Sequence, residues 1–141
     1  MTAVNVSPEV AAALAEGRPV VALESTIISH GLPRPRNHEA AIEFEQILRD
    51  QGVTPATIAI LDGVPQIGLD AKGVDRIANE DLAKASVRDI PILSAKRASG
   101  ATTVSGFGAR PLTANPSAAA MASHSGTSAK YAACCAFLAV A

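Results

Sequence analysis

The stretch VVALESTIISHGLPRPRN, residues 20–37, decides the fold of this chain. It opens with four apolar residues, Val20–Leu23, a run that is typical of a strand buried on both faces. Two prolines then stiffen a turn that leads into a predicted helix, which Asn37 caps and Gly52 ends, with apolar side chains at helical spacing. A buried strand followed by an amphipathic helix is the basic unit of an α/β protein.

The segments on either side add strands and helices of the same kind. Residues 57–61 form a second buried apolar run, Asp62-Gly63 is typical of a two-residue hairpin turn, and residues 66–69 supply a return strand. Further helices are predicted by their capping residues, namely one from Pro8 to Gly17 capped by Ser7, one over residues 71–79 capped by Asp70, and one from the Ser86–Asp89 capping box towards Gly100. The pattern predicts an α/β fold with layered helices on a mixed, mostly parallel sheet.

Composition and charge restrict the classes of function. The chain has 141 residues, of which 48% are hydrophobic and 18% charged, as expected for one globular domain. Twelve Lys and Arg against thirteen Asp and Glu, with three Phe, one Tyr and no Trp, argue against a nucleic-acid partner. The chain shows neither a signal-peptide pattern nor an apolar run of about 20 residues, so we expect a cytoplasmic protein that does not bind membranes and acts on a small metabolite.

The composition changes after Ser105. Residues 106–141 are rich in Ala, Ser, Gly and Pro, and they carry only Arg110 and Lys130 as charges, whereas all acidic residues lie before this point. No helical or strand periodicity extends through this part, although its last eleven residues favour an apolar helix or strand. We therefore expect two parts, residues 1–105 and residues 106–141.

Glu24 is the first candidate for chemistry. It ends an apolar strand at the position where α/β sheets place their ligand crevice, and partial burial suits a carboxylate to transfer protons near neutral pH. The alternative is structural, because a carboxylate at a strand end also accepts hydrogen bonds from the backbone that follows.

The loop that follows is a candidate phosphate site. Ser29, Arg34 and Arg36, with the first free amides of the helix that begins near Asn37, have the donors that a phosphate needs. The alternative is a surface turn with solvated arginines. His30 beside its glycine is more typical of a hydrogen-bonded scaffold than of a ligand-binding residue.

Two later segments add candidates. Lys84 lies just ahead of the capping box, where a lysine either grips an anionic oxygen or is simply solvated. GATTVS, residues 100–105, is a small-residue turn that allows a ligand to approach the backbone, but it matches no nucleotide phosphate-loop motif.

The ordered set ALESTIISHGLPRPRN, PATIAILDGVPQIGL, KASVRDIP and GATTVS resembles the pseudouridine-5′-phosphate glycosidase family. The resemblance is colinear from about Pro19 to Ser105. It implies an enzyme, a lyase by class, that reversibly cleaves the C–C glycosidic bond of pseudouridine 5′-phosphate to uracil and ribose 5-phosphate. It also implies a homo-oligomer.

The same resemblance implies roles for single residues. Glu24 matches the family's catalytic proton donor, Lys84 matches a substrate-binding lysine, and Val104 matches a substrate-contacting position. Family members also use a lysine that forms a Schiff base with the opened sugar, and a divalent metal, typically manganese, beside the phosphosugar.

The resemblance stops after Ser105. Family members continue with a GGIGGVHRG-like loop, a metal-holding aspartate and a CAGAKS-like segment with the Schiff-base lysine, and none of these occurs in residues 106–141. We therefore expect an incomplete fold that lacks the C-terminal half and holds no metal ligand of its own, and a tail of truncated or frameshifted origin. Two alternatives to glycosidase activity stay open: an inactive remnant, and a phosphosugar-binding module without turnover.

Overall fold

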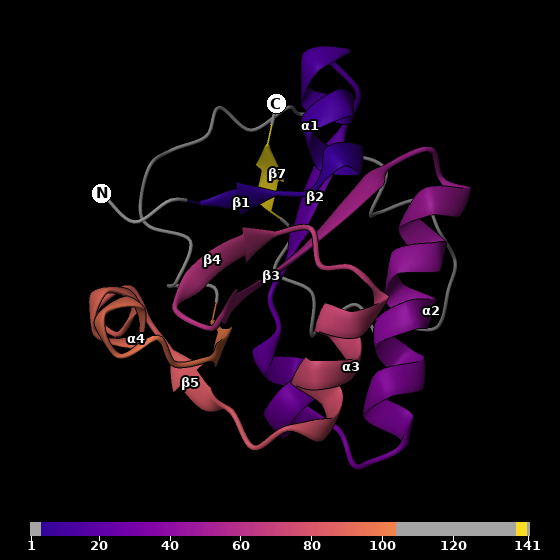
Figure 1. Ribbon diagram of the computed structural model, residues 1–141. Helices are drawn as coiled ribbons and strands as arrows, with labels where there is room; N and C mark the ends of the chain where they lie inside the picture. Colours follow the sequence, from indigo (N-terminus) through magenta and orange to yellow (C-terminus); the bar gives the residue numbers. More distant parts are fainter. Residues whose placement is uncertain (1–3, 104–137, 141) are drawn as a thin grey trace.

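The computed structural model describes residues 4–103 and 138–140, which form a seven-stranded sheet with helices on both faces (Figure 1). The strands are β1 (Asn5–Val6), β2 (Val20–Leu23), β3 (Thr54–Leu61), β4 (Val64–Ile67), β5 (Ala83–Ala85), β6 (Gly100–Thr102) and β7 (Leu138–Val140). The helices are α1 (Pro8–Ala15), α2 (Arg36–Asp50), α3 (Ala71–Asn79) and α4 (Ile90–Lys96), and η1 (Ile27–Gly31) is one turn of π-helix.

Strand β3 is the centre of the sheet, and both of its edges are occupied. On one edge it pairs with β4, which in turn pairs with β1. On the other edge, β2 runs parallel along the first half of β3, with Leu23 beside Thr57, and β6 runs antiparallel along the second half, with Ala101 beside Ala59. Strands β2 and β6 therefore point their carboxyl ends at each other along one edge of β3.

The α/β class and the mixed sheet are confirmed, but the expectation of a mostly parallel sheet is wrong for the described strands. Three of their pairings are parallel (β1–β4, β2–β3 and β5–β6), and three are antiparallel (β2–β7, β3–β4 and β3–β6). The hairpin at Asp62-Gly63 reverses the chain at one edge of β3, and β6 enters the other edge in the opposite direction to β2.

The alternation of side chains along the strands assigns each helix to a face. Ala56 packs with α1 through Val10 and Ala13, and Ile60 packs with α4 through Leu93. Side chains of opposite parity, such as Ala59, pack towards α2, α3 and η1, in the cluster Ile28, Ala41, Ala59, Val74, Ile77, Ala78 and Leu82. Figure 1 shows α2 and α3 side by side, with α4 on the opposite side of the molecule. Burial of these apolar side chains on both faces is the main force that holds the layers together.

Two of the predicted helix N-caps are confirmed, because each side chain accepts a hydrogen bond from a free backbone amide at the start of its helix. The Ser7 hydroxyl accepts a hydrogen bond from the Val10 amide at 3.3 Å, and the Asp70 carboxylate accepts one from the Gly73 amide at 2.7 Å. Both caps stand at the predicted helix starts. The hairpin also forms, with positive φ at Asp62 (52°) and Gly63 (80°), although its return strand is Val64–Ile67 instead of residues 66–69.

Other boundaries differ from the predictions. Helix α2 begins at Arg36, so Asn37 lies in its first turn and does not cap it. The Ser86 amide and hydroxyl both donate to the Asp89 carboxylate, at 2.8 and 2.6 Å, but the helix itself starts only at Ile90 and ends at Lys96. The segment Gly100–Thr102, predicted as a turn, is strand β6, because pairing with β3 and β5 outweighs the weak strand preference of small residues.

No helix in the part of the chain that the structure describes is both long enough and apolar enough to cross a membrane. Strand β7 is the described piece of the last eleven residues, and it pairs antiparallel with β2. The expected boundary at residue 105 lies outside the described residues.

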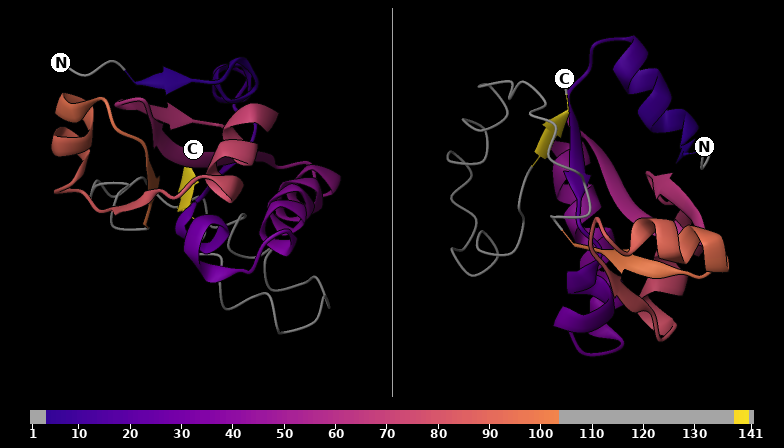
Figure 2. Two further views of the ribbon diagram at one scale, coloured as in Figure 1. Left: turned by 60° about the horizontal axis from the view of Figure 1, so that its bottom comes forward. Right: turned by 90° about the vertical axis from the view of Figure 1, so that its left-hand side faces the viewer.

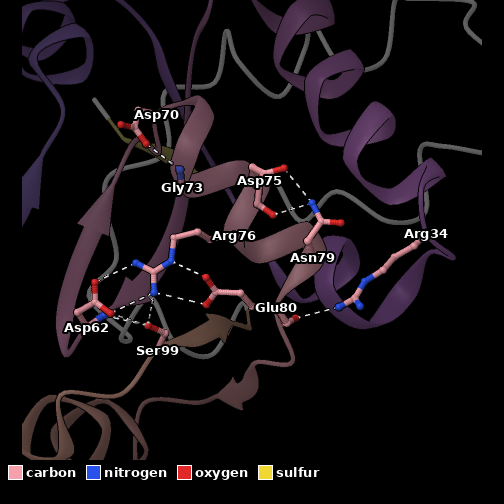
Figure 3. Close-up of polar contacts among 9 residues, drawn as sticks. All are labelled: Arg34, Asp62, Asp70, Gly73, Asp75, Arg76, Asn79, Glu80 and Ser99. Carbon is pink, nitrogen blue, oxygen red and sulfur yellow. Dashed lines mark hydrogen bonds and ion pairs between the residues drawn. The ribbon is translucent and has the colours of Figure 1, made fainter.

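An arginine on α3 ties the hairpin turn to the start of β6. The Arg76 guanidinium binds both carboxylate oxygens of Asp62, at 2.9 and 3.0 Å, and also contacts Glu80 at 2.8 Å and the Ser99 hydroxyl at 3.3 Å (Figure 3). Hydrogen bonding to this guanidinium holds the pKa of the Asp62 carboxyl below its ordinary value. A carboxyl with a depressed pKa stabilises the folded state above its unfolded pKa, and that stabilisation is lost as the pH falls through the folded pKa.

We therefore expect Asp62→Asn to flatten the acid dependence of stability. Between pH 6 and pH 3, the melting temperature of the wild type should fall about 2–4 °C further than that of the variant, as expected for an exposed ion pair. Asp75→Asn is the control. Asp75 is exposed on α3, next to Arg76, and its carboxylate accepts a hydrogen bond from the Asn79 side-chain amide instead of from a guanidinium. Equal slopes in all three proteins, followed by circular dichroism, would contradict this prediction.

Gly63 is required by both its conformation and its surroundings. Its φ is +80°, and a Cβ there would lie 2.8 Å from the Arg97 Cα and 2.9 Å from the Ser94 carbonyl oxygen. We expect Gly63→Ala to lower the free energy of unfolding by about 2–4 kcal/mol, the sum of left-handed strain and a backbone clash. Gly52→Ala, with φ +75° but nothing within 4 Å, should cost only about 1 kcal/mol. Urea denaturation measures both, and equal losses would show that the close contact does not matter.

Candidate functional site

Two side-chain hydroxyls converge on one carbonyl of β3 at the meeting point of β2 and β6. The Ile58 carbonyl accepts hydrogen bonds from the Ser25 hydroxyl at 2.6 Å and from the Thr102 hydroxyl at 2.6 Å. Ser25 and Thr102 are both buried, at 0% and 2% exposed. These hydroxyls therefore help to keep the carbonyl paired at the point where both neighbouring strands end.

Ser25 and Thr102 also bind each other through the backbone. The Ser25 amide donates to the Thr102 carbonyl at 3.1 Å, and the Thr102 amide donates to the Ser25 hydroxyl oxygen at 2.9 Å. We call Ser25, Ile58 and Thr102 the strand junction. It fixes the carboxyl end of β2, where Glu24 stands, against the carboxyl end of β6.

Glu24 is half-buried, and its carboxylate turns back onto the chain that follows. One oxygen accepts from the Thr26 amide at 3.0 Å and from the Thr26 hydroxyl, and the other accepts from the Ile27 amide at 3.0 Å. These amides open η1, so the carboxylate serves as the acceptor at the start of this turn. The contacts are those of the structural alternative, and they also give the carboxylate a fixed orientation at the strand end.

The predicted loop at Ser29 and His30 is helical in the structure. Both residues belong to η1, and π-helical turns are frequent at functional sites. The Ser29 hydroxyl donates to the Ser25 carbonyl at 3.3 Å, the buried Ile28 anchors the turn in the core, and His30 is exposed. Ser29 therefore lies close to the strand junction, whereas His30 faces outward.

Lys84 reaches the same region through β5. It is exposed and stands opposite Ala101 of β6, while its neighbour Ala85 stands opposite Thr102. The Thr103 amide donates to the Ala85 carbonyl at 3.0 Å, which continues the pairing past the strand end. The fold thus brings the strands of Glu24 and Lys84 to one junction from positions 60 residues apart in the chain. Val104 lies outside the described residues.

The predicted phosphate contacts Arg34 and Arg36 have protein partners instead. Arg34 donates from Nε to the Ala78 carbonyl at 2.8 Å and from Nη2 to the Glu80 carbonyl at 3.0 Å, so it covers the end of α3. Figure 3 shows the second of these bonds. Arg36 forms a bidentate ion pair with Glu43, at 2.9 and 2.7 Å. Both guanidinium groups are thus engaged with oxygen atoms of the protein itself.

Asn37 is buried and structural. Its side-chain amide donates to the Ile28 carbonyl at 3.0 Å and to the Ala78 carbonyl at 2.7 Å, which ties η1 to the end of α3. The Asn37 and His38 amides, in the first turn of α2, donate to the carbonyls of Pro33 and Pro35. These two amides are therefore already paired within the protein, whereas the prediction expected free amides at this helix start.

The part of the chain that the structure describes gathers no three His, Cys, Asp or Glu side chains that could share a metal ion. These residues therefore do not fit a metal site by themselves.

Comparison with known proteins identifies the family. The model of the family described as indigoidine synthase A like protein matches residues 9–110. The chain belongs to this family. Among the indigoidine synthase A-like relatives, the pseudouridine-5′-phosphate glycosidase of Frankia alni is 58% identical over 100 residues, and that of Arabidopsis thaliana is 54% identical over 104 residues.

These matches cover 70% and 72% of this chain but only 28% and 32% of the two relatives. The chain thus spans about a third of the length of the curated relatives it matches.

Two solved structures share the fold. The prealnumycin C-glycosynthase AlnA, in complex with ribulose 5-phosphate, is 42% identical with a TM-score of 0.64, and 73% of this chain covers 33% of it. An indigoidine synthase A-like protein from Thermotoga maritima is 33% identical with a TM-score of 0.65, and 74% of this chain covers 34% of it.

Sequence reasoning missed the strand junction and the role of Asn37. Ser25 and Thr102 are 77 positions apart, and no local pattern indicates that they meet. A weak signal was present in the two hydroxyl residues that follow Glu24 and in the hydroxyls of GATTVS, because polar side chains inside apolar segments are buried only with a partner.

We expect Asn37 to matter for stability. Asn37→Ala removes both hydrogen bonds to buried carbonyls and should lower the free energy of unfolding by about 2–3 kcal/mol. Asn37→Asp should cost more, since it aims a carboxylate at two carbonyl oxygens. Asn79→Ala, an exposed amide that contacts only Asp75 among the described bonds, should stay within about 0.5 kcal/mol of wild type. Urea denaturation tests this order of stabilities. An Asn37→Asp variant as stable as the wild type would refute it.

Proposed function

We propose that this chain carries part of the active site of a pseudouridine-5′-phosphate glycosidase. The observation that carries the proposal is the Glu24 strand end, which the fold joins to the strand of Lys84 within a segment 54–58% identical to proteins of that name. The reaction breaks the bond between a ribose carbon and a uracil carbon. The uracil carbon takes up a proton, and water supplies the oxygen that ends on the sugar.

Glu24 is proposed as the group that transfers the proton. A C-glycoside has no leaving heteroatom that is easily protonated, so protonation must be directed to a defined atom. The three donors from Thr26 and Ile27 hold the carboxylate in one orientation. General acid–base catalysis depends on such positioning within hydrogen-bond reach of the substrate.

Lys84 is proposed as a substrate contact, and so is Val104, which lies outside the described residues. The ammonium group of Lys84 is exposed on β5 and has the charge needed to bind a phosphate or sugar oxygen. Manganese also remains a proposal from the family resemblance. The described residues form no metal site, and we derive no step through the ion. A homo-oligomeric state and a cytoplasmic location rest on the family resemblance and on composition respectively.

A second candidate is phosphosugar binding without turnover. It is favoured because the chain spans about a third of its relatives' length and because the related C-glycosynthase is described in complex with ribulose 5-phosphate. Both candidates use the same junction, so one set of variants distinguishes them.

The test is uracil release from pseudouridine 5′-phosphate by the full 141-residue chain, with and without manganese, followed by chromatography. If the chain is active, we expect Glu24→Gln to reduce the rate at least about 100-fold, the usual contribution of a general acid–base residue. Glu16→Gln is the control, because Glu16 is an exposed partner of Arg18. An active wild type with an equally active Glu24→Gln variant would refute the role of Glu24.

Calorimetric titration with ribose 5-phosphate tests the second candidate function, phosphosugar binding without turnover. Binding by wild type without uracil release supports the binding module, and Lys84→Met should then weaken binding about tenfold through loss of the cation. Neither binding nor release in a folded chain would exclude both functions and favour an inactive remnant.

A further inference from the structure

We infer that Ser25 is a positioning residue for Glu24. Its buried hydroxyl locks the turn that carries the carboxylate onto the end of β6. The inference rests on the proposed function, since it assigns Ser25 an effect on the reaction through Glu24. It concerns a residue that forms no part of the proton transfer itself.

The first support is the number and direction of the Ser25 contacts. The hydroxyl donates to the Ile58 carbonyl at 2.6 Å and accepts from the Thr102 amide at 2.9 Å, and the Ser25 amide donates to the Thr102 carbonyl at 3.1 Å. The residue is 0% exposed, so water does not replace these partners. One hydroxyl thus joins three strands at the point where β2 and β6 end.

The second support is the rigid link between Ser25 and the carboxylate. Glu24 takes all of its described donors from Thr26 and Ile27, and the Ile28 and Ser29 amides donate to the Ser25 carbonyl at 3.1 and 3.2 Å. The carboxylate and its donors therefore move together with Ser25. A shift of this turn relative to β6 moves Glu24 as a unit.

The third support is the route from Ser25 to Lys84. Thr102 stands opposite Ala85 in the parallel β5–β6 pair, and Lys84 precedes Ala85. If the hydroxyl of Ser25 is removed, the buried Thr102 amide loses one acceptor and the Ile58 carbonyl loses one donor, and losses of this kind cost about 1–3 kcal/mol. The strand ends separate to let the amide find another partner, which moves Glu24 away from the strand of Lys84.

Thr57 offers a matched control. It is 2% exposed, lies next to Ile58 on β3, and its hydroxyl donates to the Glu45 carboxylate at 2.6 Å. That bond points towards α2, away from the strand junction. Thr57→Val therefore removes a buried hydroxyl from the same strand region without touching the turn of Glu24.

The experiment compares Ser25→Ala with Thr57→Val in the full chain by amide hydrogen exchange and by urea denaturation. Exchange of the Thr26 and Ile27 amides reports their bonds to Glu24. We expect Ser25→Ala to speed exchange of these two amides at least tenfold beyond the change that its loss of global stability explains, and Thr57→Val to show no such excess. Equal behaviour of the two variants would overturn the inference.

A second variant guards against loss of folding. Thr102→Val removes the other hydroxyl on the Ile58 carbonyl with little change of shape, and it should speed the same two amides in the same direction. No excess exchange in a folded Thr102→Val protein, when Ser25→Ala does not fold, would also overturn the inference.

Activity separates this inference from the proposed function. In an active chain, Ser25→Ala should lower kcat about tenfold with little change in KM, because the hydroxyl orients the acid without touching substrate. Excess exchange together with an unaffected kcat would overturn the positioning role. If Glu24→Gln leaves turnover unchanged, the proposed function fails. The exchange rates of the Thr26 and Ile27 amides still show whether Ser25 holds the turn in place.

Discussion

The carbonyl of Ile58 is the constraint on which the rest of the site depends. Two strands of opposite direction share one edge of β3, and both of them end beside this carbonyl. The hydroxyls of Ser25 and Thr102 donate to it there, so the pairing of the edge continues through side chains where the strands stop. Ser25 and Thr102 are therefore fixed by the topology of the sheet, and the position of Glu24 follows from Ser25.

This constraint explains which parts of the molecule could be predicted from the sequence. Signals carried by neighbouring residues were reliable, as with the Ser7 and Asp70 caps, the strand Val20–Leu23 and the Asp62-Gly63 turn. Each depends on contacts within a few residues. Strands β5 and β6 were missed because each has only three residues and depends on pairing with a distant segment.

The site shows the same division. Glu24 at the end of a buried strand could be located from the apolar run before it, and its family resemblance agrees with that position. The partners of Arg34, Arg36 and Asn37 could not be derived, because they lie on α3, along the outer face of α2, and on η1. Arginines and amides in a loop can bind the oxygens of a phosphate or the carbonyl oxygens at the end of a helix. The sequence alone does not distinguish these two kinds of acceptor.

The shared carbonyl of Ala78 has one more consequence. Arg34 and Asn37 both donate to it, and Asn37 holds Ile28 with the same side-chain amide. Pro33 and Pro35 also restrict the backbone conformations of this segment when these bonds are broken. The segment between η1 and α2 is therefore attached to the end of α3 at two residues, and it presents a surface of defined shape to a molecule that binds beside it.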